Sequence, residues 1–481
     1  MTSDPAVGAV PPPGCPAHSG AGVSSRTPLY KPEFAADPVG TYAALRRFGP
    51  VVPVELAPGV EASMVIGYET ALRVLRDPGT FSKDPRRWRA LAEGTIGPDS
   101  PVMPMMEYRP SCMFTEGEEH RRRRAVVDDS LKRVDPLALR TYVETTADTL
   151  IDSFQEAGEA DLLSNYAAVL PLLVLTRMIG CPAAYGERLF VAMRAIFEAG
   201  ADAKCAHGEA LQCLNELIAF KRATPGPDVI SWMMAHPVAL TDEEMVHELS
   251  VLFGAGTEPE QNLIANVLRL LLSDDRFAGS LSGGSLPIED ALDEVLWKDP
   301  PMANYCVHYP VHDVVLEGTR LRQGDPVIIS LAAANNDPAQ ASNHRVGNRA
   351  HLAWSAGPHA CPAQGSARLI ATVAIEKLLD RLPDVELVVP VAELKWRPGP
   401  FHRALTALPV RFEPVKDSAW ADRLPDEAPR SAPSPASTPV MQPSATHVAP
   451  DVAAPHPIVP DHGGWSARRI WERLIGRQQG R

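Results

Sequence analysis

The chain has 481 residues, 45% of them hydrophobic and 22% charged, which is typical of a soluble globular protein with a sizeable core. Its formal net charge of −13 argues against general nucleic-acid binding. The seven cysteines have no regular spacing, which argues against a disulfide framework. The sequence "CPAH" at 15–18 lacks the second pair of ligands that a zinc site needs.

The N-terminal residues 1–28 are rich in Pro, Gly, Ser and Ala, which predicts a disordered tail. They lack the basic start and apolar run of a secretory signal peptide. The best membrane candidate, 166–180, is too short to span a bilayer and contains Pro171 and Arg177. We therefore expect a cytoplasmic protein.

Residues 29–414 are predicted to form one domain without an internal linker. Helical periodicity of the apolar residues predicts helices at 38–48, 68–77, 117–133, 138–156, 185–199, 206–221, 241–272, 287–298 and 364–382. Strand-like pieces lie between them, at 63–68, 312–321, 325–331 and 385–389. The expected fold is mainly α, with a long central helix and a small β-rich part.

Beyond residue 414 the composition changes. Residues 415–464 are rich in Pro, Ala and Ser and are predicted to form an extended linker. Residues 465–481 are basic, and a helix there would be amphipathic, with apolar residues on one face and arginines around it. Two interpretations stay open: this segment docks on a partner or an anionic membrane surface, or it is a solvated end.

The predicted helix at 241–272 begins with a capping box, Thr241 with Glu244, and carries apolar residues on more than one face. It is therefore expected to be central and buried. Near its middle, Pro259 cannot donate a hydrogen bond to the carbonyl of Ala255, so the helical ladder should open there.

Small and charged residues surround this opening. Gly254 and Gly256 have no side chain, so a flat group could approach the backbone closely. A simple proline kink is the alternative. Glu258 favours a functional interpretation, because a buried carboxylate needs a reason.

A single cysteine, Cys361, lies in "SAGPHACPAQG" at 355–365, directly before the last predicted helix. Gly357 and His359 precede it in a tight Gly/Pro loop. The cysteine is either a thiolate that takes part in chemistry or a small residue packed in a crowded loop.

Three segments together point to a family. "HLAWSAGPHACPAQGSARL" resembles the cysteine loop of bacterial cytochromes P450, with Trp354 as its aromatic residue and Ala363 where a glycine is usual. "FTEGEEHRRRRAVVDDSL" resembles the haem-propionate helix, and "GAGTEPEQNLI" the oxygen-binding helix. "ISLAAANNDP" resembles the strand and turn before the cysteine loop. The resemblance covers residues 28–413.

The resemblance implies haem b with the Cys361 thiolate as axial ligand of the iron, a ligand that favours O–O cleavage. The tight loop and the following helix N-terminus would lower the pKa of the thiol. By the same resemblance, the residues that hold the haem are His120, Arg124, His308, Gly357 and His359, with His308 where the family usually has an arginine. Ala255, Gly256 and Glu258 would form the oxygen-binding groove.

The implied activity is a monooxygenase that inserts one oxygen atom of O2 into a small apolar organic substrate. Electrons would come from ferredoxin and ferredoxin reductase. The basic run Arg121–Arg124, with Lys132 and Arg133, would then meet the acidic ferredoxin. A solvated helix face is the alternative for this run.

The sequence departs from the family pattern at three places. Trp297 replaces the arginine of Glu-x-x-Arg, so Glu294 must find Arg345, Arg349 or another donor. The segment before the cysteine loop is short and lacks the usual Phe-Asp-x-x-Arg. Pro259 replaces the threonine whose hydroxyl normally organises the water that delivers protons. A subset of actinomycete cytochromes P450 shares such departures, especially Glu-x-x-Trp.

These departures keep other functions open. One is a haem protein of this fold with little monooxygenase activity: a peroxide-driven oxidase, an isomerase-like enzyme, or a partner in a membrane-associated signalling assembly that places the protein at the membrane periphery. Another is a helical scaffold without haem, in which Cys361 is structural. A nucleotide-binding enzyme is disfavoured, because "GAGTEP" lies inside a helix and not between strand and helix.

Overall fold

The computed structural model describes residues 26–197, 203–274, 276, 288–340 and 347–415. Most of the predicted N-terminal tail, nearly all of the predicted linker and the basic C-terminal segment lie outside these residues, as do residues 15–18 and Arg345. Thr27–Pro28, at the end of the predicted tail, form strand β1, which pairs with β2.

The described helices follow in chain order. They are α1 Pro32–Ala36, α2 Pro38–Leu45, α3 Tyr68–Arg76, α4 Arg89–Ala92, α5 Met103–Met106, α6 Gly117–Leu131, α7 Pro136–Phe154, α8 Leu170–Met178, α9 Ala183–Phe197, α10 Ala203–Ala223, α11 Val229–Met234, α12 Asp242–Leu271, α14 Ile288–Lys298, α15 Leu331–Asn335 and α16 Gln364–Arg381. The predicted helices are all present, because apolar residues at helical spacing bury one face of each against the core.

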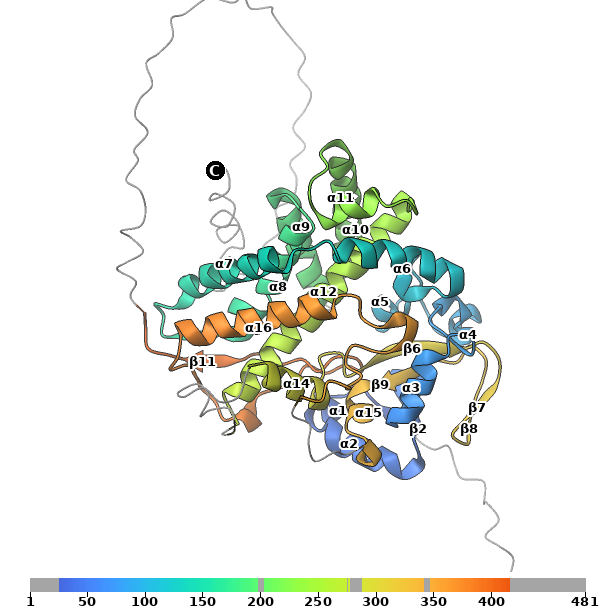
Figure 1. Ribbon diagram of the computed structural model, residues 1–481. Coiled ribbons are helices and arrows are strands. Elements are labelled where there is room, and N and C mark those ends of the chain that lie inside the picture. Colours follow the sequence, from blue (N-terminus) through green and yellow to red (C-terminus); the bar gives the residue numbers. More distant parts are fainter. Residues whose placement is uncertain (1–25, 198–202, 275, 277–287, 341–346, 416–481) are drawn as a thin grey trace, which may run out of the picture.

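The strands form a small β-rich part. They are β1 Thr27–Pro28, β2 Val51–Ala57, β3 Val60–Val65, β4 Phe81–Ser82, β5 Glu159–Asp161, β6 Asn304–Pro310, β7 Val314–Leu316, β8 Thr319–Leu321, β9 Val327–Ser330, β10 Glu386–Leu387 and β11 Pro409–Arg411. The largest sheet has the order β1-β2-β3-β9-β6-β4, and β10-β11-β5 and β7-β8 form separate sheets. Figure 1 shows the large sheet and α1–α3 on one side of the helical part.

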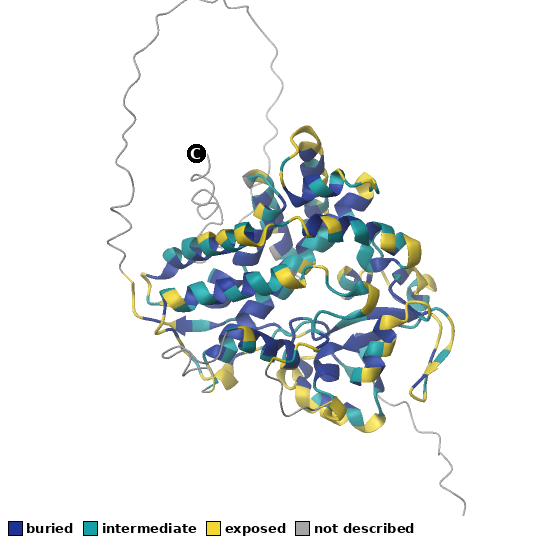
Figure 2. Cartoon of the chain, viewed as in Figure 1, coloured by how far each residue is buried: buried dark blue, intermediate teal, exposed yellow. Residues whose placement is uncertain are grey.

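The long helix α12 is the centre of the helical part. It begins at the predicted capping box, where Thr241 accepts from the N–H of Glu244 and the Glu244 carboxylate accepts from the N–H of Thr241. Figure 1 shows α12 crossing the molecule diagonally beside α16, and Figure 2 shows buried residues along much of it. It continues as a helix through Pro259, so the missing hydrogen bond does not end it.

The membrane candidate at 166–180 forms the end of a π-helical turn and α8. Leu170, Leu173 and Val174 pack into the same core as α7, α12 and α16. Within the described residues, none of the helices combines the length and the apolar character that crossing a membrane requires.

The core between α12 and α16 contains one unexpected residue, Glu260. It is 5% exposed, and its Oε1 atom has no hydrogen-bond partner among the described residues. Burial raises the pKa of this carboxyl well above 4.5, although the backbone of Ala371 opposes the shift. The folded protein therefore keeps a proton that the unfolded chain loses, and the free energy of unfolding falls as pH rises above about 4.5.

We expect Glu260→Gln to remove this fall in the free energy of unfolding at high pH, because glutamine carries no titratable proton. The variant should be more stable than the wild type by about 1–3 kcal/mol near pH 8, and the difference should shrink towards about pH 5. Urea unfolding at both pH values measures the effect. Glu393→Gln, at an exposed residue, is the control and should change stability little at either pH. An equal gain for Glu260→Gln at both pH values would contradict a buried, protonated carboxyl.

Candidate active site

The loop that carries Cys361 is tightly folded against α3. Gly357 has a φ of +71°, and a Cβ there would lie 2.2 Å from the carbonyl oxygen of Leu75, so only glycine fits. The N–H of Cys361 donates to the carbonyl of Trp354 at 2.9 Å. The loop therefore holds the cysteine directly before α16.

The surroundings of the Cys361 sulfur act on its pKa in both directions. Burial raises the pKa of the thiol, whereas the backbone N–H of Ala363 and the nearby Arg124 lower it. The sulfur therefore has a backbone donor and a guanidinium close by, the two features that favour a thiolate.

Helix α6 is tied to this loop by Arg124. Its two Nη atoms donate to the carbonyls of Pro358 at 3.1 Å and Ala360 at 2.7 Å, and its Nε donates to Asp128 at 2.6 Å. Arg124 thus fixes the backbone on the N-terminal side of Cys361. The sequence suggested a propionate partner and gave no sign of this anchoring role.

Three of the predicted histidines gather near the loop. The rings of His120 and His359 lie 4.1 Å apart, and His359 Nε2 lies 3.1 Å from Glu116 Oε1. His308 lies on β6 after an irregularity in the pairing with β9, with Cys306 at a φ of 49° and His308 Nδ1 hydrogen-bonded to the carbonyl of Cys306. The irregular strand therefore determines where the His308 ring is held.

His120 and His308 are buried and His359 is partly buried, and all three favour the neutral form. Burial lowers the pKa of His120 to about 4, with the neighbouring His359 as a further cause, and burial also lowers the pKa of His308 and His359. The His120 Nε2 atom has no partner among the described residues.

Lys83 belongs to this cluster and was missed by the sequence analysis. It is 6% exposed, and its charge acts on both His308 and His359. None of the described carboxylates forms an ion pair with it, and burial lowers its pKa. A lysine in a short loop, "FSKDP", looks solvent-exposed in sequence, so no local signal marks it.

The middle of α12 presents backbone rather than side chains. Ala255 is exposed although its neighbours Phe253 and Thr257 are buried, and a Cβ on Gly254 would meet no atom within 4 Å. A Cβ on Gly256 would lie 3.1 Å from Leu175 of α8, so helix packing explains this glycine. A flat group could therefore approach at Ala255 and Gly254.

Glu258 is buried and engaged away from solvent. Its Oε1 atom accepts from Asn262 at 3.2 Å and forms an ion pair with Arg397, while Oε2 has no partner among the described residues. The nearest hydroxyl along the helix, that of Thr257, donates to the carbonyl of Phe253 at 2.7 Å. The Thr257 hydroxyl and the Oε1 atom of Glu258 are therefore already engaged within the protein, and only Oε2 of Glu258 is without a partner among the described residues.

The altered Glu-x-x-Arg segment forms a different network. Of the donors that the sequence left open for Glu294, the structure shows other ones, Arg276 and Lys298, rather than Arg349. Asp293, one residue earlier and 3% exposed, binds Arg349 and Arg368 instead. Because Arg368 lies on α16, this carboxylate ties α14 to the helix that follows Cys361. The sequence analysis did not single out Asp293.

Trp297 fills the place of the missing arginine as a packed residue. It is 6% exposed, its Nε1 donates to the carbonyl of Asn348 at 2.7 Å, and its ring meets that of His351 edge to face at 5.8 Å. We expect Trp297→Ala to destabilise the protein by about 3–5 kcal/mol, because it leaves a large cavity.

The conservative variant Trp297→Phe separates packing from hydrogen bonding. It keeps most of the volume and loses the N–H, so it should cost only about 1 kcal/mol. Denaturant unfolding of both variants measures the two contributions. An unchanged unfolding midpoint for Trp297→Ala would contradict the packing role.

The residues around Cys361 fit the haem that the sequence resemblance implies. The Cys361 thiol, with its backbone donor, would supply the ligand to the iron, and the exposed backbone on α12 would suit a flat ring. Near the loop, the buried donors His120 Nε2 and Trp354 Nε1 have no partner among the described residues, and Lys83 forms no ion pair with a described carboxylate, although the charge of Glu116 acts on it. Two carboxylates at the edge of a haem would supply acceptors and negative charge for His120 and Lys83.

Comparisons with known proteins agree with this geometry. No family model matches the chain. Cytochrome P450 monooxygenase PikC of Streptomyces venezuelae is 34% identical over 397 residues, which cover 79% of this chain and 92% of PikC. The mycinamicin IV hydroxylase/epoxidase of Micromonospora griseorubida is 29% identical, over 77% of this chain and 94% of its own length. The structure of CYP154C4 from a Streptomyces species superposes with a TM-score of 0.74 at 28% identity, covering 81% and 99% of the two chains.

Proposed function

This chain belongs to the cytochrome P450 family of haem-thiolate monooxygenases, and from that premise we propose that it inserts one oxygen atom of O2 into a small apolar organic substrate, with Cys361 as the iron ligand. The observation that carries the proposal is the placement of Cys361. A tight loop that only glycine fits, a backbone donor at the sulfur and the Arg124 anchor all converge on this one residue.

When bound, haem with a thiolate ligand supplies the oxygen-activating chemistry. The protein residues fix its position. Cys361 supplies the ligand atom, and Arg124 keeps the loop carbonyls from moving away. His120, His308, His359 and Lys83 form a cluster of hydrogen-bond donors that would hold the propionates.

Proton delivery is the step in which this chain differs from the family pattern. Pro259 has neither a hydroxyl nor an N–H, and the carbonyl of Ala255 therefore lacks its helical donor. That carbonyl can accept a hydrogen bond from a water or from a substrate hydroxyl. Glu258 would have to leave Arg397 or use its unpaired Oε2 to recharge that water. We infer an atypical and inefficient relay.

The same observation favours a second candidate function, peroxide-driven oxidation. Hydrogen peroxide brings its own protons, so it depends less on a relay at Pro259. A membrane-associated signalling role rests on the C-terminal segment, which lies outside the described residues.

Ferredoxin remains the proposed electron donor, with a smaller basic surface than the sequence suggested. Arg122 and Arg123 bind Glu244, and Arg124 binds the cysteine loop, so these three are internal anchors. Arg121 and Lys132 keep 69% and 73% of their side chains exposed. Arg133 is also exposed, with its guanidinium over the ring of Trp232. These three residues are therefore the candidates for contact with an acidic partner.

Oxygen incorporation tests the proposed function. The holoprotein is screened for substrates by the shift of its Soret band, with mycinamicin IV among the compounds, the substrate that the name of one relative specifies. Turnover with a surrogate ferredoxin and its reductase under isotopically labelled O2 should place one labelled oxygen atom in the product. Label found only in water or peroxide, with every compound that shifts the Soret band, would contradict a monooxygenase.

A further inference from the structure

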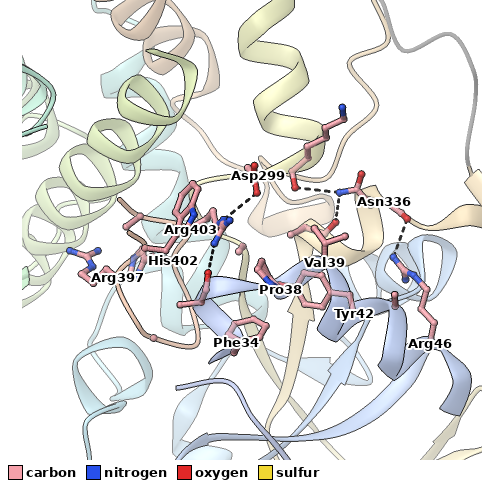
Figure 3. Close-up of a pocket in the computed structure, with 18 of the residues that line it drawn as sticks. Phe34, Pro38, Val39, Tyr42, Arg46, Asp299, Asn336, Arg397, His402 and Arg403 are labelled. Atoms are coloured by element: carbon pink, nitrogen blue, oxygen red, sulfur yellow. Dashed lines mark hydrogen bonds and ion pairs between the residues drawn. The ribbon is translucent and has the colours of Figure 1, made fainter. Parts of the chain in front are cut away.

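A cavity lies beside the β-rich part, between the N-terminal helices α1 and α2 and the loop before β11. Its volume is about 630 Å³, within the range of small-molecule sites. The lining comes from α1, α2, the end of α14, α15 and residues 396–404. Figure 3 shows the residues that face it. Neither Cys361 nor the histidine cluster takes part in it.

One wall of this cavity is apolar and partly open to solvent. Phe34, Pro38 and Tyr42 line it from α1 and α2, and Val39 is 68% exposed although it is apolar. Trp396 lines the cavity from the loop. This surface suits the hydrocarbon or ring portion of a ligand.

The loop wall is held in place by main-chain contacts. The N–H of Asn304 donates to the carbonyl of Phe401 at 3.0 Å, Asn304 Nδ2 donates to that of Pro400 at 3.0 Å, and the N–H of Arg403 donates to that of Pro301 at 2.9 Å. Tyr42 donates from its hydroxyl to Asn304 Oδ1 at 2.8 Å. The cavity is therefore preformed, which lowers the entropy cost of binding.

The charges that line the cavity are mainly positive. Arg46, Lys298, Arg397 and Arg403 face a single acidic residue, Asp299. Two of these cations have carboxylate partners of their own, since Lys298 pairs with Glu294 and Arg397 with Glu258. The other two, Arg403 and Arg46, are less well neutralised.

Arg403 shares Asp299 with Arg269, so one carboxylate serves two guanidiniums. Arg46 donates to the carbonyls of Ile66, Ala333 and Asn336, and it forms no ion pair with any carboxylate of the described residues. Burial lowers the pKa of Arg46, and Asp337 opposes this shift from a distance. A guanidinium held only by neutral carbonyls favours an added anion.

We propose that this cavity binds an amphipathic carboxylate, with its apolar body against Phe34, Pro38 and Tyr42 and its anionic head at Arg46. Figure 3 shows Pro38, Val39 and Tyr42 lying between Arg403 and Arg46. A ligand whose anionic head lies at Arg46 can therefore place its apolar body on these side chains. The site contains neither Cys361 nor the histidine cluster, and Arg397, which pairs with Glu258, is its link to the proposed proton relay.

Calorimetric titration of the holoprotein with octanoate and with 1-octanol tests the proposal. The haem is saturated with imidazole in both titrations, so that neither compound reports binding at the iron. Octanoate should bind at least about tenfold more tightly than 1-octanol, which corresponds to about 1.4 kcal/mol. Arg46→Met should remove this preference, whereas Arg46→Lys should retain part of it.

A variant that blocks the cavity distinguishes octanoate binding in this cavity from octanoate binding elsewhere on the protein. Ala43→Trp places a large side chain at an exposed lining residue of α2 and should weaken octanoate binding at least about tenfold. Ala44→Trp, at the next exposed residue and outside the lining, is the matched control and should bind octanoate as the wild type does. Circular dichroism checks that each variant is folded. No binding heat, equal affinity for the two compounds, or full binding by Ala43→Trp would overturn the proposal.

Discussion

Cys361→Ser is expected to abolish oxygen transfer, with a loss of at least about a thousandfold in turnover, or about 4 kcal/mol in the activation free energy. A serine hydroxyl stays protonated near neutral pH and cannot supply the electron-rich ligand that the chemistry needs. Turnover with a surrogate ferredoxin measures the loss. Bound haem is quantified in the same samples, so that loss of haem and loss of chemistry are told apart.

Cys205→Ser is the matched control for this substitution. Cys205 is an exposed free cysteine on α10. Its replacement should leave haem content and turnover unchanged. A Cys361→Ser protein that turned over at the wild-type rate would show that another residue ligates the iron.

Pro259→Thr is expected to raise the fraction of electrons that end in product rather than in peroxide or water. Threonine restores the N–H that the carbonyl of Ala255 lacks, and it adds a hydroxyl that can organise a water. General acid–base groups contribute about 10²–10⁴-fold to proton-transfer steps, so a gain of several-fold in coupling is expected. Product formed per NADH or NADPH consumed gives the coupled fraction.

Pro259→Ala separates the two effects of that substitution. Alanine restores the backbone N–H without a hydroxyl, so it should repair the helix and leave coupling low. Added hydrogen peroxide should narrow the difference between the three proteins, because peroxide brings its own protons. Tight coupling in the wild type would show that Glu258 or a substrate group already completes a relay.

The sequence predicted the helices well because each buries one face, and that burial appears as periodic apolar residues. The central helix is the clearest case, since its capping box and apolar faces are local features. Helix α8 was missed because nearly every residue of "LPLLVLTRM" is buried, which leaves no polar face and no period to detect. Strand β6 was not among the predicted strands, and its pairing with β9 is irregular between Tyr305 and His308.

The candidate site also contains a part that the sequence could predict and a part that it could not. Cys361, Gly357 and His359 belong to one short loop, so their proximity could be predicted from the chain itself. The ion pair between Glu258 and Arg397 joins residues 139 positions apart, and the tie between Asp293 and Arg368 spans 75. No spacing rule predicts such contacts, because they depend on how distant elements pack. Lys83 was missed for the same reason.

The absorption spectrum of the purified protein, reduced and treated with carbon monoxide, tests the central claim most directly. If the Cys361 thiolate ligates haem iron, the Soret band of this complex should lie well to the red of its position in histidine-ligated haem proteins. Cys361→Ser should lose that band, and Cys205→Ser should keep it. A folded wild-type protein that takes up no haem, or one whose reduced carbon monoxide complex shows no red-shifted band when freshly prepared, would contradict the assignment of Cys361 as the iron ligand.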